Sequence, residues 1–207
     1  MKTPLKCILW DFGNTLVDER WMRSGPETLS GWNEAYGAII DDIRDAWDLG
    51  DMSFRDLANK LSDRMGIESD EVIAHVRMRC ESINFYGNVL NVAKRCPLPQ
   101  AIVTVNPDVF SEWVVPYYKL DQIFSPIVTS SEEKTLDKSD ICDIALAELS
   151  GHITRKEALL IDNKKESIEG WKTLSGSVYH FRGPDVFEKD IVDKNGVLAE
   201  VFMAQNF

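Results

Sequence analysis

The chain has 207 residues and a mass of 23.5 kDa, the size of one domain or of one domain that carries a large insertion. Apolar residues make up 44% and charged residues 28%, and this ordinary globular composition excludes intrinsic disorder, collagen and fibrous repeats. Acidic residues outnumber basic residues 34 to 23, which gives a net charge of −11 and an isoelectric point near 4.8. Such a field repels nucleic acids and anionic membranes, so neither is an expected partner.

The cysteines give no sign of a metal or redox site, because no Cys-x-x-Cys pair occurs. They are Cys7, Cys80, Cys96 and Cys142. We expect buried, reduced thiols in a cytoplasmic protein. The apolar run near the amino terminus is too short for a secretory signal, and no stretch approaches the roughly 20 apolar residues that a transmembrane helix requires.

Five short runs of apolar and β-branched residues are interpreted as buried strands. In chain order they are Cys7–Trp10, Ala101–Val105, Pro126–Thr129, Ala158–Ile161 and Ser177–Phe181. The runs are nearly continuous, which is typical of a parallel sheet covered on both faces. Helical periods separate the last four runs, and one such set is Phe110, Trp113, Val114 and Tyr117. This alternation predicts an α/β fold with a three-layer, doubly wound, Rossmann-like parallel sheet.

The segment between the first two strands is far longer than a single crossover and is interpreted as several helices in a row. The first has an apolar face within residues 29–47. We expect Ser53 to cap the second helix and Gly66 to end it, and Ser69 to cap the third. A fourth helix precedes the second strand. The predicted domains are an α/β core formed by residues 1–16 and 98–207, and an all-helical cap formed by residues 17–97.

Polar side chains that can do chemistry follow several of the predicted strands. Asp11 follows the first strand, Thr104 lies near the end of the second, and Asp162 follows the fourth. Two lysines, Lys134 and Lys138, follow the third strand and precede a helix. In an open α/β sheet, ligands bind outside the carboxyl ends of the strands. We therefore expect two carboxylates, a hydroxyl and an ammonium to meet at one edge.

The order of these residues, with a helical insertion after the first of them, resembles the haloacid dehalogenase superfamily of aspartate-nucleophile hydrolases. Two further segments are similar to that family. Gly50–Phe54 resembles a turn between its cap helices, and Tyr118–Phe124 resembles the stretch that leads into its third core strand. The resemblance covers nearly the whole chain and implies an α/β core with a helical cap.

The resemblance also implies a mechanism, in which Asp11 attacks phosphorus and forms an aspartyl-phosphate. Mg²⁺ would offset the repulsion between this carboxylate and the phosphate, held by Asp11, Asp162 and the backbone carbonyl of Gly13. Thr104 and Lys138 are the other implied catalytic residues, since a hydroxyl and an ammonium stabilise charge on the phosphoryl group. The implied phosphate-binding residues are Asn14, Thr15, Thr104, Asn106 and Lys138.

Two positions depart from the family's phosphatases. A second aspartate usually stands two residues after the nucleophile and acts as general acid and base, but here the residue is Gly13. Asn163 stands where a further acid often follows Asp162, so the metal site has less charge. General acid–base help is worth about 10²–10⁴ in rate. We therefore expect slow turnover, a good leaving group such as that of a sugar 1-phosphate or an acyl phosphate, or a substituting group from the cap.

The site lysine is expected to be Lys138 rather than Lys134. The family often has Lys-Pro-Asp-Pro at this position, and here Lys138 stands immediately before the predicted helix with Asp140 two positions later. Lys134 lies one helical turn earlier and stays the alternative.

Three functions fit these residues. The leading hypothesis is an Mg²⁺-dependent phosphatase that acts on a small phosphorylated metabolite. One alternative is a carbon–halogen hydrolase that uses Asp11 without a metal. Asp162 argues against it, because a second buried carboxylate beside the nucleophile is costly without a metal to pair with it. Another is a binding or regulatory protein that kept the fold and lost turnover, toward which Gly13 and Asn163 point. Substrate identity and oligomeric state are open, and specificity is expected in the cap near Arg20, Arg23 and the Gly50 turn.

Overall fold

The computed structural model describes residues 3–18, 29–149, 151–193, 198 and 201. The described strands form a five-stranded sheet in the order β3-β2-β1-β4-β5, and every neighbouring pair is parallel. They are β1 (Cys7–Trp10), β2 (Gln100–Thr104), β3 (Ile127–Thr129), β4 (Ala158–Asp162) and β5 (Ser177–His180). Each overlaps one of the predicted runs, and the α/β fold class is confirmed.

The central strand β1 shows why the apolar runs are continuous. It pairs with β2 on one side and with β4 on the other. Cys7 and Leu9 enter the hydrophobic cluster on one face of the sheet, whereas Ile8 and Trp10 enter the cluster on the other face. All four side chains are fully buried. Both faces of the strand therefore require apolar side chains, so apolar and polar residues do not alternate along β1.

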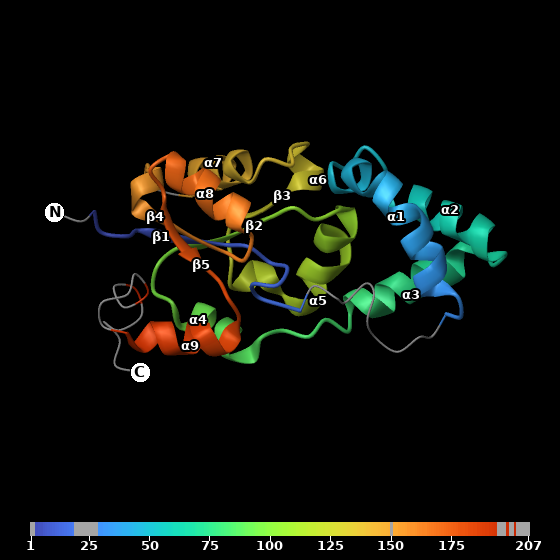
Figure 1. The fold of residues 1–207 in the computed structure, drawn as a ribbon, viewed down its shortest axis with the longest axis horizontal. Helices are drawn as coiled ribbons and strands as arrows, with labels where there is room; N and C mark the ends of the chain where they lie inside the picture. Colours follow the sequence, from blue (N-terminus) through green and yellow to red (C-terminus); the bar gives the residue numbers. More distant parts are fainter. Residues whose placement is uncertain (1–2, 19–28, 150, 194–197, 199–200, 202–207) are drawn as a thin grey trace.

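Helices cover both faces of the sheet and complete three layers (Figure 1). On one face lie α7 (Lys138–Glu148) and α8 (Lys165–Thr173), where Trp171 is fully buried. On the opposite face lie α4 (Gly87–Arg95) and α9 (Pro184–Val192). The shorter elements are the π-helix η2 (Phe110–Val114), α5 (Val115–Tyr118), η3 (Leu120–Gln122), α6 (Ser130–Glu133) and η4 (Arg155–Glu157).

The insertion after β1 gathers at one end of the molecule (Figure 1). Its helices are α1 (Trp32–Asp48), α2 (Phe54–Met65) and α3 (Ser69–Cys80). The range 17–97 predicted for the cap also contains α4, which packs against α9 on the core. The division of the chain at these two positions stays a prediction. Among the described residues, no helix combines the length and the apolar character needed to cross a membrane.

Local capping chemistry explains where the inserted helices begin and end. Ser53 caps α2 as predicted, because its Oγ accepts from Asp56 N while Asp56 Oδ2 accepts from Ser53 N. Gly66 ends α2 as predicted, with a left-handed φ of 67° that suits a residue without a Cβ. The prediction for Ser69 is wrong: Glu68 is the N-cap of α3, and the Ser69 hydroxyl bonds to a side chain of α2 instead.

The two segments that join the insertion to the core lie side by side. Val17 forms bridges with Gly13 and with Phe85 on the returning segment. The next residue of that segment, Tyr86, donates from its backbone N to Leu16 O at 2.9 Å. The returning chain therefore holds the loop that follows β1 and fixes where that loop ends.

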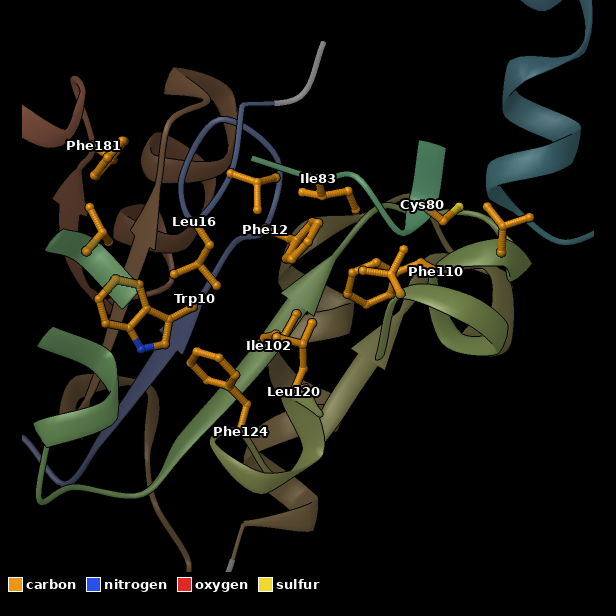
Figure 2. Close-up of a cluster of buried hydrophobic side chains, with 14 of the residues drawn as sticks. Trp10, Phe12, Leu16, Cys80, Ile83, Ile102, Phe110, Leu120, Phe124 and Phe181 are labelled. Atoms are coloured by element: carbon orange, nitrogen blue, oxygen red, sulfur yellow. The ribbon is translucent and has the colours of Figure 1, made fainter. Parts of the chain in front are cut away.

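Aromatic packing anchors the same loop from below (Figure 2). The rings of Phe12 and Phe110 meet edge to face with centroids 4.7 Å apart, and both residues are buried. Tyr117, which the helical period placed on the buried face, is 54% exposed, because η2 is wound more widely than an α-helix and shifts the residues that follow it. The four cysteines form no disulfide, and all but Cys96 are buried.

Candidate active site

The carboxyl edge of the sheet brings together the residues predicted at strand ends. Asp11 directly follows β1, Thr104 ends β2 and Asp162 ends β4, and these three strands are neighbours. Lys138 is the first residue of α7, which packs against β2 and β3. The exposed fraction of each of these four residues is 8% or less. Ionisable side chains buried this deeply must pair with one another to be stable.

Lys138 is the lysine that reaches the carboxylates. Its Nζ donates to Asp11 Oδ1 at 2.6 Å and to Val103 O at 2.8 Å, and it lies 3.3 Å from Asp162 Oδ2. Burial disfavours the charged ammonium, but the two carboxylates outweigh it and raise the pKa of Lys138 above its ordinary value. Lys134 instead donates to Gly50 O in the cap, so it does not enter this cluster.

Both carboxylate oxygens of Asp11 accept hydrogen bonds. Its Oδ1 accepts from Lys138 and its Oδ2 accepts from Thr15 Oγ1 at 3.1 Å. Burial raises the pKa of Asp11 to about 6. The positive charge of Lys138 lowers this pKa and the negative charge of Asp162 raises it, but burial has the largest effect. The carboxylate is therefore mainly ionised only above this pH.

Asp162 is the least satisfied member of the cluster. It is fully buried, and its Oδ1 accepts from Lys164 N at 2.7 Å. Its Oδ2 lies within ion-pair distance of Lys138 Nζ but has no hydrogen-bond partner among the described residues. One ammonium therefore serves two buried carboxylates, and the cluster retains an excess of negative charge.

The side chain of Asn163 points into the same cluster. Its carboxamide is oriented by its neighbours, because the reverse orientation would turn the oxygen toward acceptors. In the satisfied orientation its nitrogen donates to Gly13 O at 3.0 Å and to Asp11 Oδ2 at 3.2 Å. Asn163 was expected to reduce the charge of the metal site, and its contacts with Gly13 O and Asp11 Oδ2 were not predicted.

The other predicted phosphate-binding residues surround Asp11 in different ways. Thr15 is fully buried and uses its hydroxyl on Asp11. Thr104 Oγ1 accepts from Asn106 Nδ2 at 2.6 Å, which leaves the threonine's own hydrogen available for a phosphoryl oxygen. Asn14 has a left-handed φ of 55° in the turn after Asp11. Their contact with phosphate stays a prediction.

Comparison with known proteins gives structural matches. No family model matches the sequence, and no curated protein matches it. L-2-haloacid dehalogenase from Xanthobacter autotrophicus, with chloropropionic acid covalently bound, superposes with a TM-score of 0.62 at 14% identity, over 97% of this chain and 87% of that one. A predicted HAD-like family hydrolase from Porphyromonas gingivalis gives a TM-score of 0.63 at 16% identity, over 86% and 91%. The chain has the haloacid dehalogenase (HAD) fold.

A third match shows that the HAD fold does not select the reaction. A HAD family enzyme from Bacteroides thetaiotaomicron, in complex with magnesium and inorganic phosphate, has a TM-score of 0.60 at 16% identity, over 86% of this chain and 95% of that one. One neighbour thus holds a chlorinated acid covalently and another holds magnesium and phosphate. The resemblance expected from the sequence is confirmed for the fold, and the reaction must be argued from the site.

The donor atoms of this HAD-fold chain suit a magnesium ion. Asp11, Asp162 and the carbonyl of Gly13 offer only oxygen, which Mg²⁺ prefers, and the excess negative charge of the cluster favours a cation. Among the described residues, no group of three or more His, Cys, Asp or Glu side chains could hold a metal. The carbonyl and water molecules would therefore complete the coordination.

Contacts between the core and the insertion were not predicted. The two carboxylate oxygens of Asp108, on the core, accept from Trp47 Nε1 at 2.8 Å and from Phe54 N at 2.7 Å. Ser130 Oγ donates to Asp48 O at 2.6 Å. These partners lie 54 to 82 positions apart in the chain. The local sequence at Asp108, Asn-Pro-Asp after β2, favours a turn but identifies neither Trp47 nor Phe54 as a partner.

A separate open pocket of about 680 Å³ lies where β2 begins, at the opposite edge of the sheet. Its lining includes Lys94, Gln100 and Ser125 and none of the predicted site residues. It is therefore not the candidate active site. Arg20 and Arg23, near which specificity was expected, lie outside the described residues.

Proposed function

We propose that the protein is a hydrolase, an Mg²⁺-dependent phosphatase that acts on a small phosphorylated metabolite through Asp11. The observation that carries this proposal is the buried cluster of Asp11, Lys138 and Asp162, in which one ammonium faces two carboxylates. Phosphoryl transfer uses a nucleophilic carboxylate, a fixed positive charge and a site for a metal cation. A small-molecule substrate and a cytoplasmic location belong to the same proposal.

In the first step, an oxygen of Asp11 attacks phosphorus, and the bond between phosphorus and the leaving oxygen breaks. Lys138 holds Asp11 in place and places a positive charge beside the transferring group. The free hydrogen of Thr104 Oγ1 can donate to a phosphoryl oxygen. The product of this step is an aspartyl-phosphate on Asp11 and the dephosphorylated leaving group.

In the second step, water attacks the phosphorus of the aspartyl-phosphate, which releases inorganic phosphate and restores Asp11. Asp11, Asp162 and Gly13 O are the groups that would hold Mg²⁺, and the ion would neutralise charge on the phosphate. Since Gly13 has no carboxyl group to move protons, water must protonate the leaving oxygen as it departs in the first step. Good leaving groups, as in sugar 1-phosphates and acyl phosphates, therefore suit this site best.

A carbon–halogen hydrolase, which needs no metal, is the second candidate. It is favoured because the Asn163 carboxamide donates to Gly13 O and Asp11 Oδ2, two of the oxygens that would otherwise hold a metal. In that reaction Asp11 would displace halide from carbon, form an ester, and be regenerated by water. Neither step needs a general acid, which agrees with Gly13. A binding protein that kept the HAD fold without turnover is the third candidate.

One experiment separates these candidates. The protein is incubated with sugar 1-phosphates, an aryl phosphate, an acyl phosphate and 2-haloacids, each with Mg²⁺ and with a chelator, and released phosphate and halide are measured. We expect phosphate release that requires Mg²⁺. Halide release indifferent to the chelator would replace the phosphatase with the dehalogenase, and no release from any compound would favour the binding protein.

The matched control is Asp11→Asn, which keeps the shape of the side chain and removes the nucleophile. We expect its phosphate release to fall by at least about 10³-fold, as loss of a nucleophile usually does. Retention of full activity would contradict the mechanism for either reaction.

A further inference from the structure

The backbone of Asn163 is fixed on both sides. Lys164 N, immediately after it, donates to Asp162 Oδ1 at 2.7 Å, and His180 Nε2 lies 3.1 Å from Asn163 O. Asp162 and His180 are also register partners in β4 and β5. The carboxamide of Asn163 is therefore presented to the site by a well-supported turn, and rotation of the side chain is its main freedom.

The carboxamide occupies the place where it meets two of the three oxygens suited to a cation. In the orientation assigned from its hydrogen-bond partners, its nitrogen is 3.0 Å from Gly13 O and 3.2 Å from Asp11 Oδ2. Magnesium binds oxygen at about 2.1 Å and requires near-octahedral access to it. An N–H donor directed at the same lone pairs stands in the path of an ion that would bind both oxygens. The donor also satisfies those oxygens without adding net charge.

We propose that Asn163 is a positioning residue whose carboxamide competes with Mg²⁺ for Gly13 O and Asp11 Oδ2. In the ion-free protein the amide holds the nucleophile and the Gly13 carbonyl in place. Mg²⁺ binds only when the carboxamide turns away, so its affinity is lowered by the loss of two hydrogen bonds. This inference rests on the proposed Mg²⁺ site but not on which substrate is hydrolysed.

The test is Mg²⁺ binding to the full-length protein, measured by calorimetry and by the shift of Tm in an Mg²⁺ titration without substrate. Asn163→Asp replaces the competing donor with an oxygen ligand and should tighten Mg²⁺ binding by about tenfold or more. Asn163→Ala removes the donor without adding charge and should tighten binding by a smaller factor. A merely structural residue would give weaker binding when replaced.

Lys164→Gln is the matched control. It changes the charge by the same amount as Asn163→Asp at the adjacent position, but its side chain is exposed and only its backbone contacts Asp162. The charge of Lys164 lowers the pKa of Asp11, but it is exposed and screened, so we expect a clearly smaller gain in Mg²⁺ affinity than in Asn163→Asp. An equal gain in this variant would show that general electrostatics, and not the carboxamide, sets the affinity, and would overturn the proposal.

A spectroscopic readout follows the carboxamide itself. The side-chain ¹⁵N–¹H₂ resonances of Asn163, assigned by their loss in Asn163→Ala, should shift as Mg²⁺ saturates the protein. Unchanged resonances at saturation, or Mg²⁺ affinity unaffected by Asn163→Asp, would overturn the proposal. Tighter Mg²⁺ binding by Asn163→Asp without phosphate release from any compound would uphold the role of Asn163 while the proposed phosphatase activity fails.

Discussion

Two regions at the same end of the sheet use lysine in opposite ways. In the buried charge cluster, formed by Asp11, Lys138 and Asp162, the lysine side chain is 8% exposed and faces two carboxylates. In the contact between core and cap, Lys134 is 55% exposed and donates to the backbone oxygen of Gly50. The first lysine sets the charge of the site, whereas the second holds the insertion against the core.

The difference originates in the backbone between the two lysines. Lys134 lies at the end of α6 with a left-handed φ of 56°, so its side chain leaves toward the cap. Asp137 then caps α7 by accepting from Ser139 N at 2.7 Å, which starts the helix at Lys138. Lys134 and Lys138 are thus only four positions apart, yet one holds the insertion against the core and the other is buried in the charge cluster.

The largest expected effect comes from Lys138→Met, which keeps the length of the side chain and leaves two buried carboxylates without their ammonium. Breaking a buried ion pair in this way should lower the free energy of unfolding by about 3–5 kcal/mol. Phosphate release should also disappear. Urea unfolding at pH 7 measures the first effect. A loss below about 1 kcal/mol would contradict the assigned pairing.

Lys134→Met is the matched control for Lys138→Met, because the two substitutions differ only in where the lysine lies. An exposed pair contributes little, so its unfolding free energy should change by less than about 1 kcal/mol. The loss in Lys138→Met should shrink as the pH falls toward 5, since protonation of Asp11, whose pKa is raised by burial, relieves the repulsion. Lys134→Met should show no such recovery.

The second prediction concerns pH, because burial raises the pKa of Asp11 to about 6 from an ordinary value of 3.8. With Mg²⁺ bound, the ion lowers the pKa of Asp11 below this ion-free value. In the presence of Mg²⁺, kcat/KM should therefore fall roughly tenfold per pH unit only below that lower pKa, as Asp11 is protonated. The folded protein binds this proton more tightly than the unfolded chain, so the contribution of Asp11 to stability declines as pH rises from about 4 to 6 and is constant above.

Asp11→Asn tests the stability half of that prediction. The variant lacks the titrating group, so its stability relative to the native protein should increase between pH 4 and pH 6 and then level off. Thermal unfolding measured across this range gives the difference directly. A relative stability that fell with rising pH would mean that the pKa of Asp11 is lowered in the folded state.

How much of this could be predicted from the sequence depends on how local each feature is. Asp11, Thr104 and Asp162 interrupt apolar runs, and parallel strands bring such interruptions to one edge, so their meeting was predictable. The choice between two lysines followed from the position of a helix start. The direction of the Asn163 carboxamide was not predictable, because it depends on the Gly13 turn, which is distant in the chain.

The cap contact was unpredictable for the same reason. Asp108 bonds to Trp47 and Phe54, and nothing near Asp108 in the chain signals either partner. The helix α4 likewise reads as one more helix of the insertion, and only its packing against α9 places it on the core. Local periodicity identified the helices but not the surfaces that they cover.

The smallest predicted effect concerns that contact. Asp108→Asn keeps the size of the side chain but turns one of its two acceptor oxygens into a donor, so either Trp47 Nε1 or Phe54 N loses its partner. Loss of one such bond at a helix start should lower the free energy of unfolding by about 1–2 kcal/mol. Urea unfolding measures this loss.

The kinetic consequence of Asp108→Asn distinguishes the two regions. Because Asp108 lies in the core–cap contact and not in the charge cluster, the pH below which kcat/KM falls should be the same as in the native protein. KM should rise if the docked insertion helps to enclose the substrate. A shift of the pH profile in this variant would show that the charge of Asp108 affects the ionisation of Asp11. The core–cap contact and the charge cluster would then be electrostatically coupled, and Lys134 and Lys138 would differ only in how exposed they are.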